Sequence, residues 1–145
     1  MDESRRVMMA IARTRRAWMS HTKAVAHELG IPESYRPIIS YLNRHPGANQ
    51  KNIAEFCNIT TAAVNQTVKE MIADDYVRKE TDEADKRYTK LFLTEKGTET
   101  ALKLRKHLHH SDEIITAAIT EEKEQEMIEL LDKIYDCIRR NLTSC

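Results

Sequence analysis

The feature that most constrains the fold is the segment 49–94, in which two short helical patterns are followed by two strand patterns. Asn49 and Thr60 each precede a helical pattern, and their side-chain oxygens can accept hydrogen bonds from the free N–H groups of a first turn. Asn58 lies between the patterns and tolerates the left-handed conformation in which helices often end. These signals predict two short helices, over 50–57 and 61–74.

Apolar residues in both helices recur at helical spacing and predict the faces that pack inward. The stripes are Ile53, Phe56 and Cys57 in the first helix, and Val64, Val68 and Met71 in the second. The second stripe leaves one polar face exposed, made of Thr61, Ala62, Asn65, Gln66 and Lys69.

The chemistry of this exposed face suits duplex DNA. Small residues at its N-terminal end let a helix enter a major groove, and the amides of Asn65 and Gln66 can pair with adenine. Lys69, farther along, can contact a phosphate. A solvated helix face has the same composition, so on residue types alone that alternative stays open.

Two β-forming stretches, 76–81 and 88–93, enclose a segment that is charged apart from Ala84, which predicts a hairpin with a solvated tip. Five basic residues lie on or near it: Arg78, Lys79, Lys86, Arg87 and Lys90. A guanidinium at such a tip can enter a narrow minor groove, whereas the neighbouring acids favour a loop that is merely soluble. Two helices and a hairpin in this order predict a mainly α fold with a small β wing, a winged helix-turn-helix.

A longer pattern in the hairpin resembles a known signature. Asp85-x-Arg87, followed five residues later by Leu93-Thr94-Glu95-Lys96-Gly97, resembles the wing of the multiple-antibiotic-resistance regulator (MarR) family. The preceding pattern, Ile53-Ala54, Ile59-Thr60 and Val64 through Val77, resembles the family's recognition unit. The resemblance extends over nearly the whole chain.

The resemblance implies a role for each part of this unit. The helix 61–74 would lie in the major groove, Arg87 would reach the adjacent minor groove, and Asp85 would hold the wing in shape. Lys86, beside Arg87, is also predicted to contact DNA. The chain departs from the family at Asp74-Asp75, where glycine is common. Asp tolerates a left-handed turn, but two acids near DNA weaken binding.

Long helices are predicted on both sides of this unit, over 3–29 and 95–118 and from 120 onward, with a short helix over 34–43. The last helix carries an apolar stripe that needs a partner: Met127, Leu130, Leu131, Ile134, Tyr135, Ile138 and Leu142. The resemblance implies a two-fold dimer of interlocking terminal helices. The residues predicted to form it are Val7, Ile11, Met127, Leu131, Ile134 and Ile138.

These predictions divide the chain into an N-terminal dimerisation helix (1–30), a DNA-binding domain (31–97) and C-terminal dimerisation helices (98–145). The 23 basic and 23 acidic residues cancel, so overall charge does not point to nucleic acid and any basic footprint must come from the distribution. The sequence has neither an apolar run long enough to span a bilayer nor a signal-peptide core, and we expect a cytoplasmic protein with no membrane partner.

The effector is left open by the sequence. The usual effector of the family is an aromatic or phenolic anion, and the resemblance implies a crevice lined by Trp18, His21, Val25, Tyr41 and Phe56, which core packing explains equally well. The ligand-binding residues are therefore unknown. The peroxide-sensing branch needs a cysteine near the N-terminus, and none precedes Cys57.

Zinc is the alternative effector. A zinc-sensing branch has a His-rich segment where this chain has His107, His109 and His110, and His107 and His110 share a helix face. The short second helix offers Tyr35 and Arg36 where acid and imidazole ligands would be needed. We therefore predict no metal and no cofactor.

No nucleophile elbow, phosphate loop or HExxH motif is present, and three glycines leave little for a substrate loop, so an enzyme is not predicted. The prediction is a repressor that binds pseudo-palindromic duplex DNA as a homodimer and responds to a small ligand. The alternatives are a zinc-responsive regulator of the same fold and a helical adaptor that binds only protein. The adaptor would leave Asp85-x-Arg87 beside a polar helix unexplained.

Overall fold

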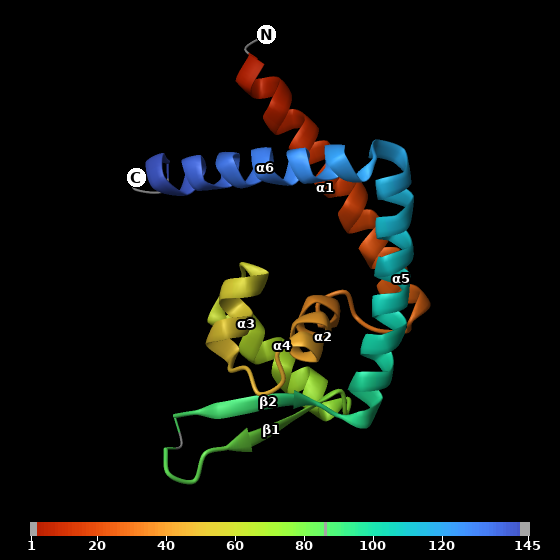
Figure 1. Cartoon of the computed structure of the whole chain (residues 1–145). Helices are drawn as coiled ribbons and strands as arrows, with labels where there is room; N and C mark the ends of the chain where they lie inside the picture. The colour runs from red at the N-terminus through yellow and green to blue at the C-terminus, as the bar shows by residue number, and fades with distance from the viewer. Residues whose placement is uncertain (1–2, 86, 143–145) are drawn as a thin grey trace. The chain divides into compact units, whose positions relative to one another are not determined.

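The computed structural model describes residues 3–85 and 87–142, which form helices and one two-stranded antiparallel sheet (Figure 1). The elements are α1 (Glu3–Glu28), α2 (Tyr35–Arg44), α3 (Gln50–Cys57), α4 (Thr61–Ala73), β1 (Val77–Thr81), β2 (Thr89–Leu93), α5 (Glu95–Ile119) and α6 (Glu121–Asn141). The predicted mainly α fold with a small β wing is confirmed.

The chain divides into two compact units after Lys106. The first holds α1 to α4, the sheet and the beginning of α5, and the second holds the remainder of α5 together with α6. The core of the first unit lies where α2 contacts α3 and β2, α3 contacts α4, and α4 contacts β1. Its fully buried side chains include Ile38, Ile39, Leu42, Ile53, Val64, Val68, Met71 and Leu91.

The inward stripe predicted for α4 is confirmed, whereas the one predicted for α3 is partly wrong. Ile53 is buried, but Phe56 is 54% exposed and Cys57 is half-buried. The reason is that Ala54 is buried beside Ile53, which turns Phe56 to the flank of the helix. There its ring packs on Tyr41, with centroids 4.7 Å apart.

Side-chain caps fix the N-terminal ends of α3 and α4. Asn49 Oδ1 accepts from Asn52 N at 2.8 Å, and Asn52 Oδ1 accepts from Asn49 N at 3.2 Å, which is a reciprocal capping box. Thr60 Oγ1 accepts from Ala63 N at 3.1 Å. Asn58 ends α3 in the left-handed region at φ 52°. The predicted caps are confirmed.

The sheet forms backbone hydrogen bonds with the segment that precedes α3. β1 and β2 pair from Val77 opposite Leu93 to Thr81 opposite Thr89. On the other edge of β2, Gly47 N donates to Leu91 O at 2.8 Å and Leu91 N donates to Ala48 O at 3.0 Å. The hairpin therefore has a backbone connection to the segment just before α3.

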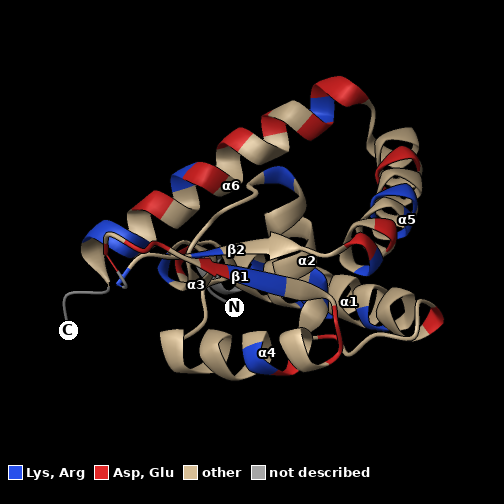
Figure 2. Cartoon of the chain, turned by 90° about the horizontal axis from the view of Figure 1, so that it is seen from below, with Lys and Arg blue, Asp and Glu red and all other residues tan. Residues whose placement is uncertain are grey.

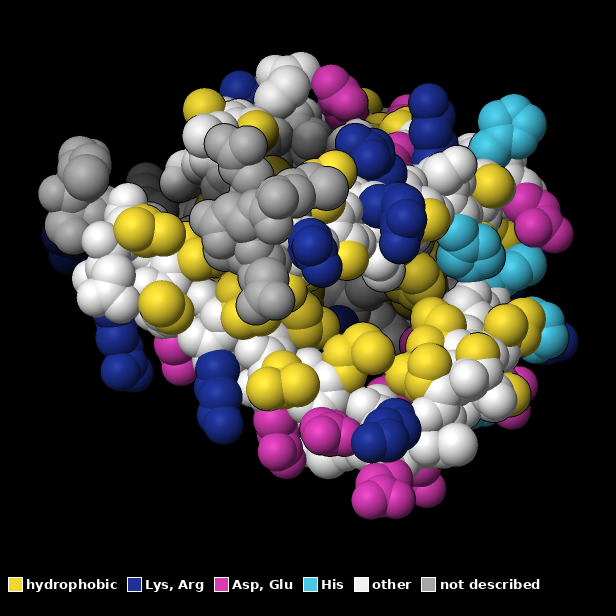
Figure 3. Space-filling view, turned by 90° about the horizontal axis from the view of Figure 1, so that it is seen from above, with side chains coloured by type: hydrophobic (Ala, Val, Ile, Leu, Met, Phe, Trp, Pro, Cys, Tyr) yellow, Lys and Arg dark blue, Asp and Glu magenta, His cyan; other side chains and the backbone are white. Residues whose placement is uncertain are grey.

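The second unit leaves the apolar stripe of α6 open. None of the described residues of α6 is buried, and exposed apolar side chains appear in the space-filling view (Figure 3). Those exposed on α6 are Met127, Ile128, Leu130, Leu131 and Tyr135, while Ile134 and Ile138 are half-buried. Thr120 precedes α6 at φ 67° but its side chain makes no capping bond. Across the described residues, no helix is long and apolar enough to cross a membrane.

Candidate nucleic-acid interface

The polar face of α4 lies opposite its buried apolar stripe, and most of it is exposed, as predicted. Thr61, Ala62, Gln66 and Lys69 are exposed, while Asn65 is half-buried. Gln50 Nε2 on α3 donates to Asn65 Oδ1 at 3.4 Å, which orients the Asn65 amide and leaves its two N–H donors available. Gln66 Nε2 donates to Glu70 Oε1 at 3.0 Å. Both amides predicted to meet bases are thus held by neighbouring side chains.

Charge is distributed unevenly along α4. Its N-terminal half carries no ionised side chain, while Lys69, Glu70 and Asp74 lie in or just after its second half (Figure 2). The free N–H groups and the helix macrodipole make the N-terminal end positive. The end with small residues is therefore also the end that attracts a phosphate.

The tip of the hairpin is organised around one acid. Arg87 donates to Asp85 from Nε at 2.9 Å and from Nη2 at 2.9 Å, and its backbone N donates to Asp85 Oδ1 at 3.1 Å. The arginine side chain nevertheless remains 88% exposed. Its hydrogen bonds lower the pKa of Asp85, and Asp85 raises the pKa of Arg87, so both groups are ionised at neutral pH. These paired hydrogen bonds hold the exposed Arg87 guanidinium in one direction and leave its Nη1 available.

The other basic residues of the hairpin are in different situations. Arg78 is paired with Glu80 and lies over the ring of Phe92 at 4.6 Å, so its charge is largely engaged within the sheet. Lys79 and Lys90 are exposed on the strands. Lys86, predicted to contact DNA beside Arg87, lies outside the described residues.

The turn after α4 has a set of contacts that the sequence did not predict. Asp75 adopts φ 63°, so the left-handed turn expected of this Asp-Asp pair is confirmed. Tyr35 Oη on α2 donates to Asp74 Oδ2 at 2.5 Å, and Lys96 Nζ on α5 donates to Asp74 O at 2.8 Å. The only sequence signal was the replacement of a glycine by acids, which gave no indication of their partners.

The candidate effector residues fall into separate ring contacts. On α1, the ring centroids of Trp18 and His21 are 5.6 Å apart, and Val25 is buried. The ring centroids of Tyr41 and Phe56 are 4.7 Å apart. Burial raises the pKa of the Cys57 thiol, and a nearby Arg36 opposes this shift only partly. Cys57 is thus kept as a neutral thiol at pH 7 rather than a reactive thiolate.

The histidines of α5 lie close to one acid. His109 Nε2 is 3.4 Å from Glu113 Oε1, and His110 Nδ1 is 3.8 Å from Glu113 Oε2, while His107 is half-buried. Within residues 3–85 and 87–142, no three His, Cys, Asp or Glu side chains are grouped as a metal site would require.

These elements define a winged helix-turn-helix, and known proteins share it. The model of the MarR family matches residues 29–87. HTH-type transcriptional regulator YybA of Bacillus subtilis is 29% identical over 97 residues, or 67% of this chain and 65% of that protein. The chain thus aligns with just under two thirds of the length of this relative.

Two solved structures share the fold. MarR of Staphylococcus aureus, in complex with salicylate and kanamycin, has a TM-score of 0.82 at 20% identity, covering 95% of this chain and 93% of that one. The transcriptional repressor CouR, bound to a 23-mer DNA duplex, has a TM-score of 0.75 at 19% identity, covering 87% and 89%. Residues 29–87 therefore match the MarR family, and the fold of the chain is that of MarR-family regulators. The matched family model and the relative from Bacillus subtilis are those of transcription regulators.

Proposed function

We propose that this chain regulates transcription by binding pseudo-palindromic duplex DNA as a homodimer. The observation that carries the proposal is the pairing of Arg87 with Asp85 at an exposed wing tip, next in the chain to a helix whose outer face is small and amide-bearing. An arginine held in this way loses little freedom when it enters a narrow minor groove. CouR, which has the same fold, is bound to a DNA duplex in its solved structure.

The proposed DNA contacts follow the chemistry of each position. Thr61 and Ala62 allow close approach to the major groove, Asn65 and Gln66 read base edges, and Lys69 meets a phosphate. Arg87 occupies the adjacent minor groove, and Lys86 is proposed as a further DNA contact. Asp85 keeps the wing tip in shape by accepting both the side-chain and the backbone N–H groups of Arg87.

The dimer is proposed to form through the terminal helices, with 1–30 and 98–145 flanking a DNA-binding domain at 31–97. Exposed apolar side chains on α6 support this, because a stripe of that extent is costly to leave in water. The proposed dimer residues are Val7, Ile11, Met127, Leu131, Ile134 and Ile138.

The regulator is proposed to act as a cytoplasmic repressor that a small aromatic or phenolic anion releases from DNA. The salicylate bound in the structure of Staphylococcus aureus MarR supports this ligand class. Release requires the ligand to favour a dimer whose half-site separation no longer matches the operator.

Base recognition by α4 is tested with Asn65→Ala and Gln66→Ala, each expected to cost roughly 1–3 kcal/mol of discrimination between the operator and single-base variants. Competition binding with fluorescently labelled duplexes measures this. Gln125→Ala is the matched control, because Gln125 on α6 donates to Glu129 four residues on, as Gln66 donates to Glu70. If both α4 variants weaken binding to every duplex equally, the assigned role in base recognition is wrong.

A further inference from the structure

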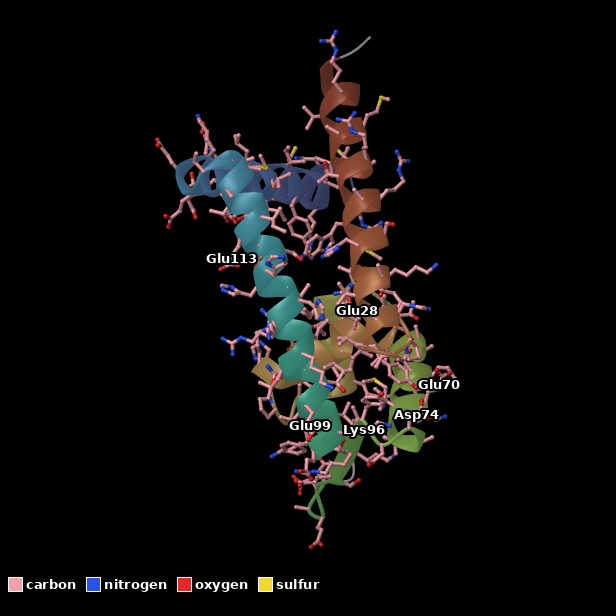
Figure 4. The ribbon with its side chains drawn as sticks, turned by 90° about the vertical axis from the view of Figure 1, so that its right-hand side faces the viewer. Glu28, Glu70, Asp74, Lys96, Glu99 and Glu113 are labelled. Atoms are coloured by element: carbon pink, nitrogen blue, oxygen red, sulfur yellow. The ribbon has the colours of Figure 1, made fainter. Side chains whose placement is uncertain are left out.

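The C-terminal end of α4 is held from two neighbouring helices at a single residue. Tyr35, from the first turn of α2 and only 1% exposed, donates from Oη to the Asp74 carboxylate at 2.5 Å. Lys96, from the first turn of α5, donates from Nζ to the Asp74 backbone carbonyl at 2.8 Å. Figure 4 labels Asp74 and Lys96 next to each other at this junction. We call Tyr35, Asp74 and Lys96 the α4 anchor.

Ring contacts surround the α4 anchor. The rings of Tyr35 and Tyr76 meet edge to face with centroids 5.5 Å apart, and Lys96 Nζ lies 4.3 Å from the centroid of the Tyr76 ring. Thr94 Oγ1 donates to Asp75 O at 2.5 Å, which ties the same turn to the start of α5. Contacts from α2 and from the start of α5 therefore fix the direction in which α4 enters this turn.

Asp74 is not explained by helix stability. An acid at the C-terminal end of a helix faces the negative end of the macrodipole, which is unfavourable for the helix. Without Asp74, however, the buried Tyr35 hydroxyl would lose its hydrogen-bond partner among the described residues. Burial and then the Asp74 hydrogen bond raise the pKa of Tyr35, so the phenol remains a donor at any physiological pH.

We propose that Tyr35 and Lys96 are positioning residues for DNA recognition, which act through Asp74 by fixing the direction of α4 relative to α2 and α5. This inference rests on the proposed function, because the geometry it protects is that of Asn65 and Gln66 facing base edges. Direct base readout depends on angle and distance, whereas phosphate contacts tolerate small rotations. The α4 anchor thus contributes to sequence preference more than to overall affinity.

The test compares Tyr35→Phe with Tyr76→Phe, each of which removes one hydroxyl from the same ring pair. Among the described residues the Tyr76 hydroxyl makes no hydrogen bond, so Tyr76→Phe is the matched control. The readout is the ratio of affinities for the operator and for a scrambled duplex, measured well below the melting temperature of each variant. We expect Tyr35→Phe to lower this ratio about tenfold and Tyr76→Phe to change it less than twofold.

A double-mutant cycle tests whether Tyr35 acts through Asp74. Asp74→Asn keeps an acceptor and should retain the wild-type ratio, while Asp74→Ala should lower it as Tyr35→Phe does, and the double variant Tyr35→Phe with Asp74→Ala should be no worse than either. A merely structural role would lower the melting temperature without changing the ratio. That result, or losses that multiply in the double variant, would overturn the inference.

A second readout separates this inference from the proposed function. Amide hydrogen exchange follows the last turn of α4, where Asp74 N donates to Glu70 O and Tyr76 N donates to Met71 O. We expect about tenfold faster exchange there in Tyr35→Phe and no change in Tyr76→Phe. If the wild-type protein shows no preference between duplexes, the proposed function fails. Unchanged exchange in Tyr35→Phe would instead reject the anchor itself.

Discussion

Arg87 and Asp85 illustrate how one residue prepares another for a role that neither stability nor charge alone explains. A surface ion pair with an 88% exposed partner adds little to folding, since water and salt screen it. Its effect is on direction, because two side-chain bonds and one backbone bond fix where the guanidinium points. Both residues could be identified from their spacing in the chain, but the paired hydrogen bonds between them are visible only in three dimensions.

Gly97 is a second residue with a specific requirement. A Cβ at this position would lie 2.2 Å from the carbonyl oxygen of Tyr76, a backbone atom that hydrogen-bonds with Thr94 N and so cannot move freely. We predict that Gly97→Ala lowers the free energy of unfolding by about 1–3 kcal/mol, despite the better helix propensity of alanine. Urea denaturation followed by circular dichroism measures this loss.

The control for Gly97→Ala is Thr98→Ala, an exposed neighbour in the same turn of α5. It should leave the free energy of unfolding within about 0.5 kcal/mol of the wild-type value. Equal or greater stability of Gly97→Ala would contradict the close approach between α5 and the turn after α4.

Residues that act within their own turn could be predicted from the sequence, and residues that act across the fold could not. The caps at Asn49 and Thr60 bond three residues ahead, so spacing alone identifies them. Tyr35 and Asp74 are separated by two helices in the chain, and no local pattern connects them. The prediction that Phe56 packs inward is wrong, because Ala54 occupies the buried face of α3 beside Ile53.

At the scale of elements, α4 depends on its first turn. Thr60 caps its N-terminus, and the N–H groups of that turn belong to the end proposed to approach DNA. We predict that Thr60→Ala lowers the free energy of unfolding by about 0.5–2 kcal/mol, because Ala63 N loses its acceptor. Thr60→Ser, which keeps the oxygen, should lose less than half as much in the same urea experiment.

If Thr60→Ala and Thr60→Ser were equally stable, the capping bond would not be responsible for the stability of α4. The bounds of α3 and α4 could be predicted from caps and periodicity, since both are local properties. The backbone bonds from Gly47 and Ala48 to Leu91 were not, because they join segments on opposite sides of the helix-turn-helix.

At the scale of the whole molecule, the apolar stripe of α6 is a surface that a single chain leaves exposed to water. We predict that Leu131→Glu, at a side chain that is 41% exposed, converts the proposed dimer into monomers, because it would place a charge in the proposed apolar interface. Sedimentation equilibrium measures the dissociation constant, which should rise at least about a hundredfold.

Lys133→Glu is the control for the dimer, because it introduces the same residue two positions away on the same helix but off the stripe. It should leave the dissociation constant unchanged within a factor of about three. A Leu131→Glu protein that remains dimeric would remove α6 from the interface. The stripe could be predicted from periodicity, but a partner cannot be derived from one chain's pattern alone.

Binding of DNA is the claim on which the rest depends, and fluorescence anisotropy tests it most directly. The wild-type protein would be titrated onto the intergenic duplex upstream of its own gene and onto a scrambled duplex, across a salt series, beside Arg87→Ala. We predict salt-sensitive binding that favours the intergenic duplex and is lost in Arg87→Ala. Equally weak binding of both duplexes at moderate salt, unchanged in Arg87→Ala, would contradict the account.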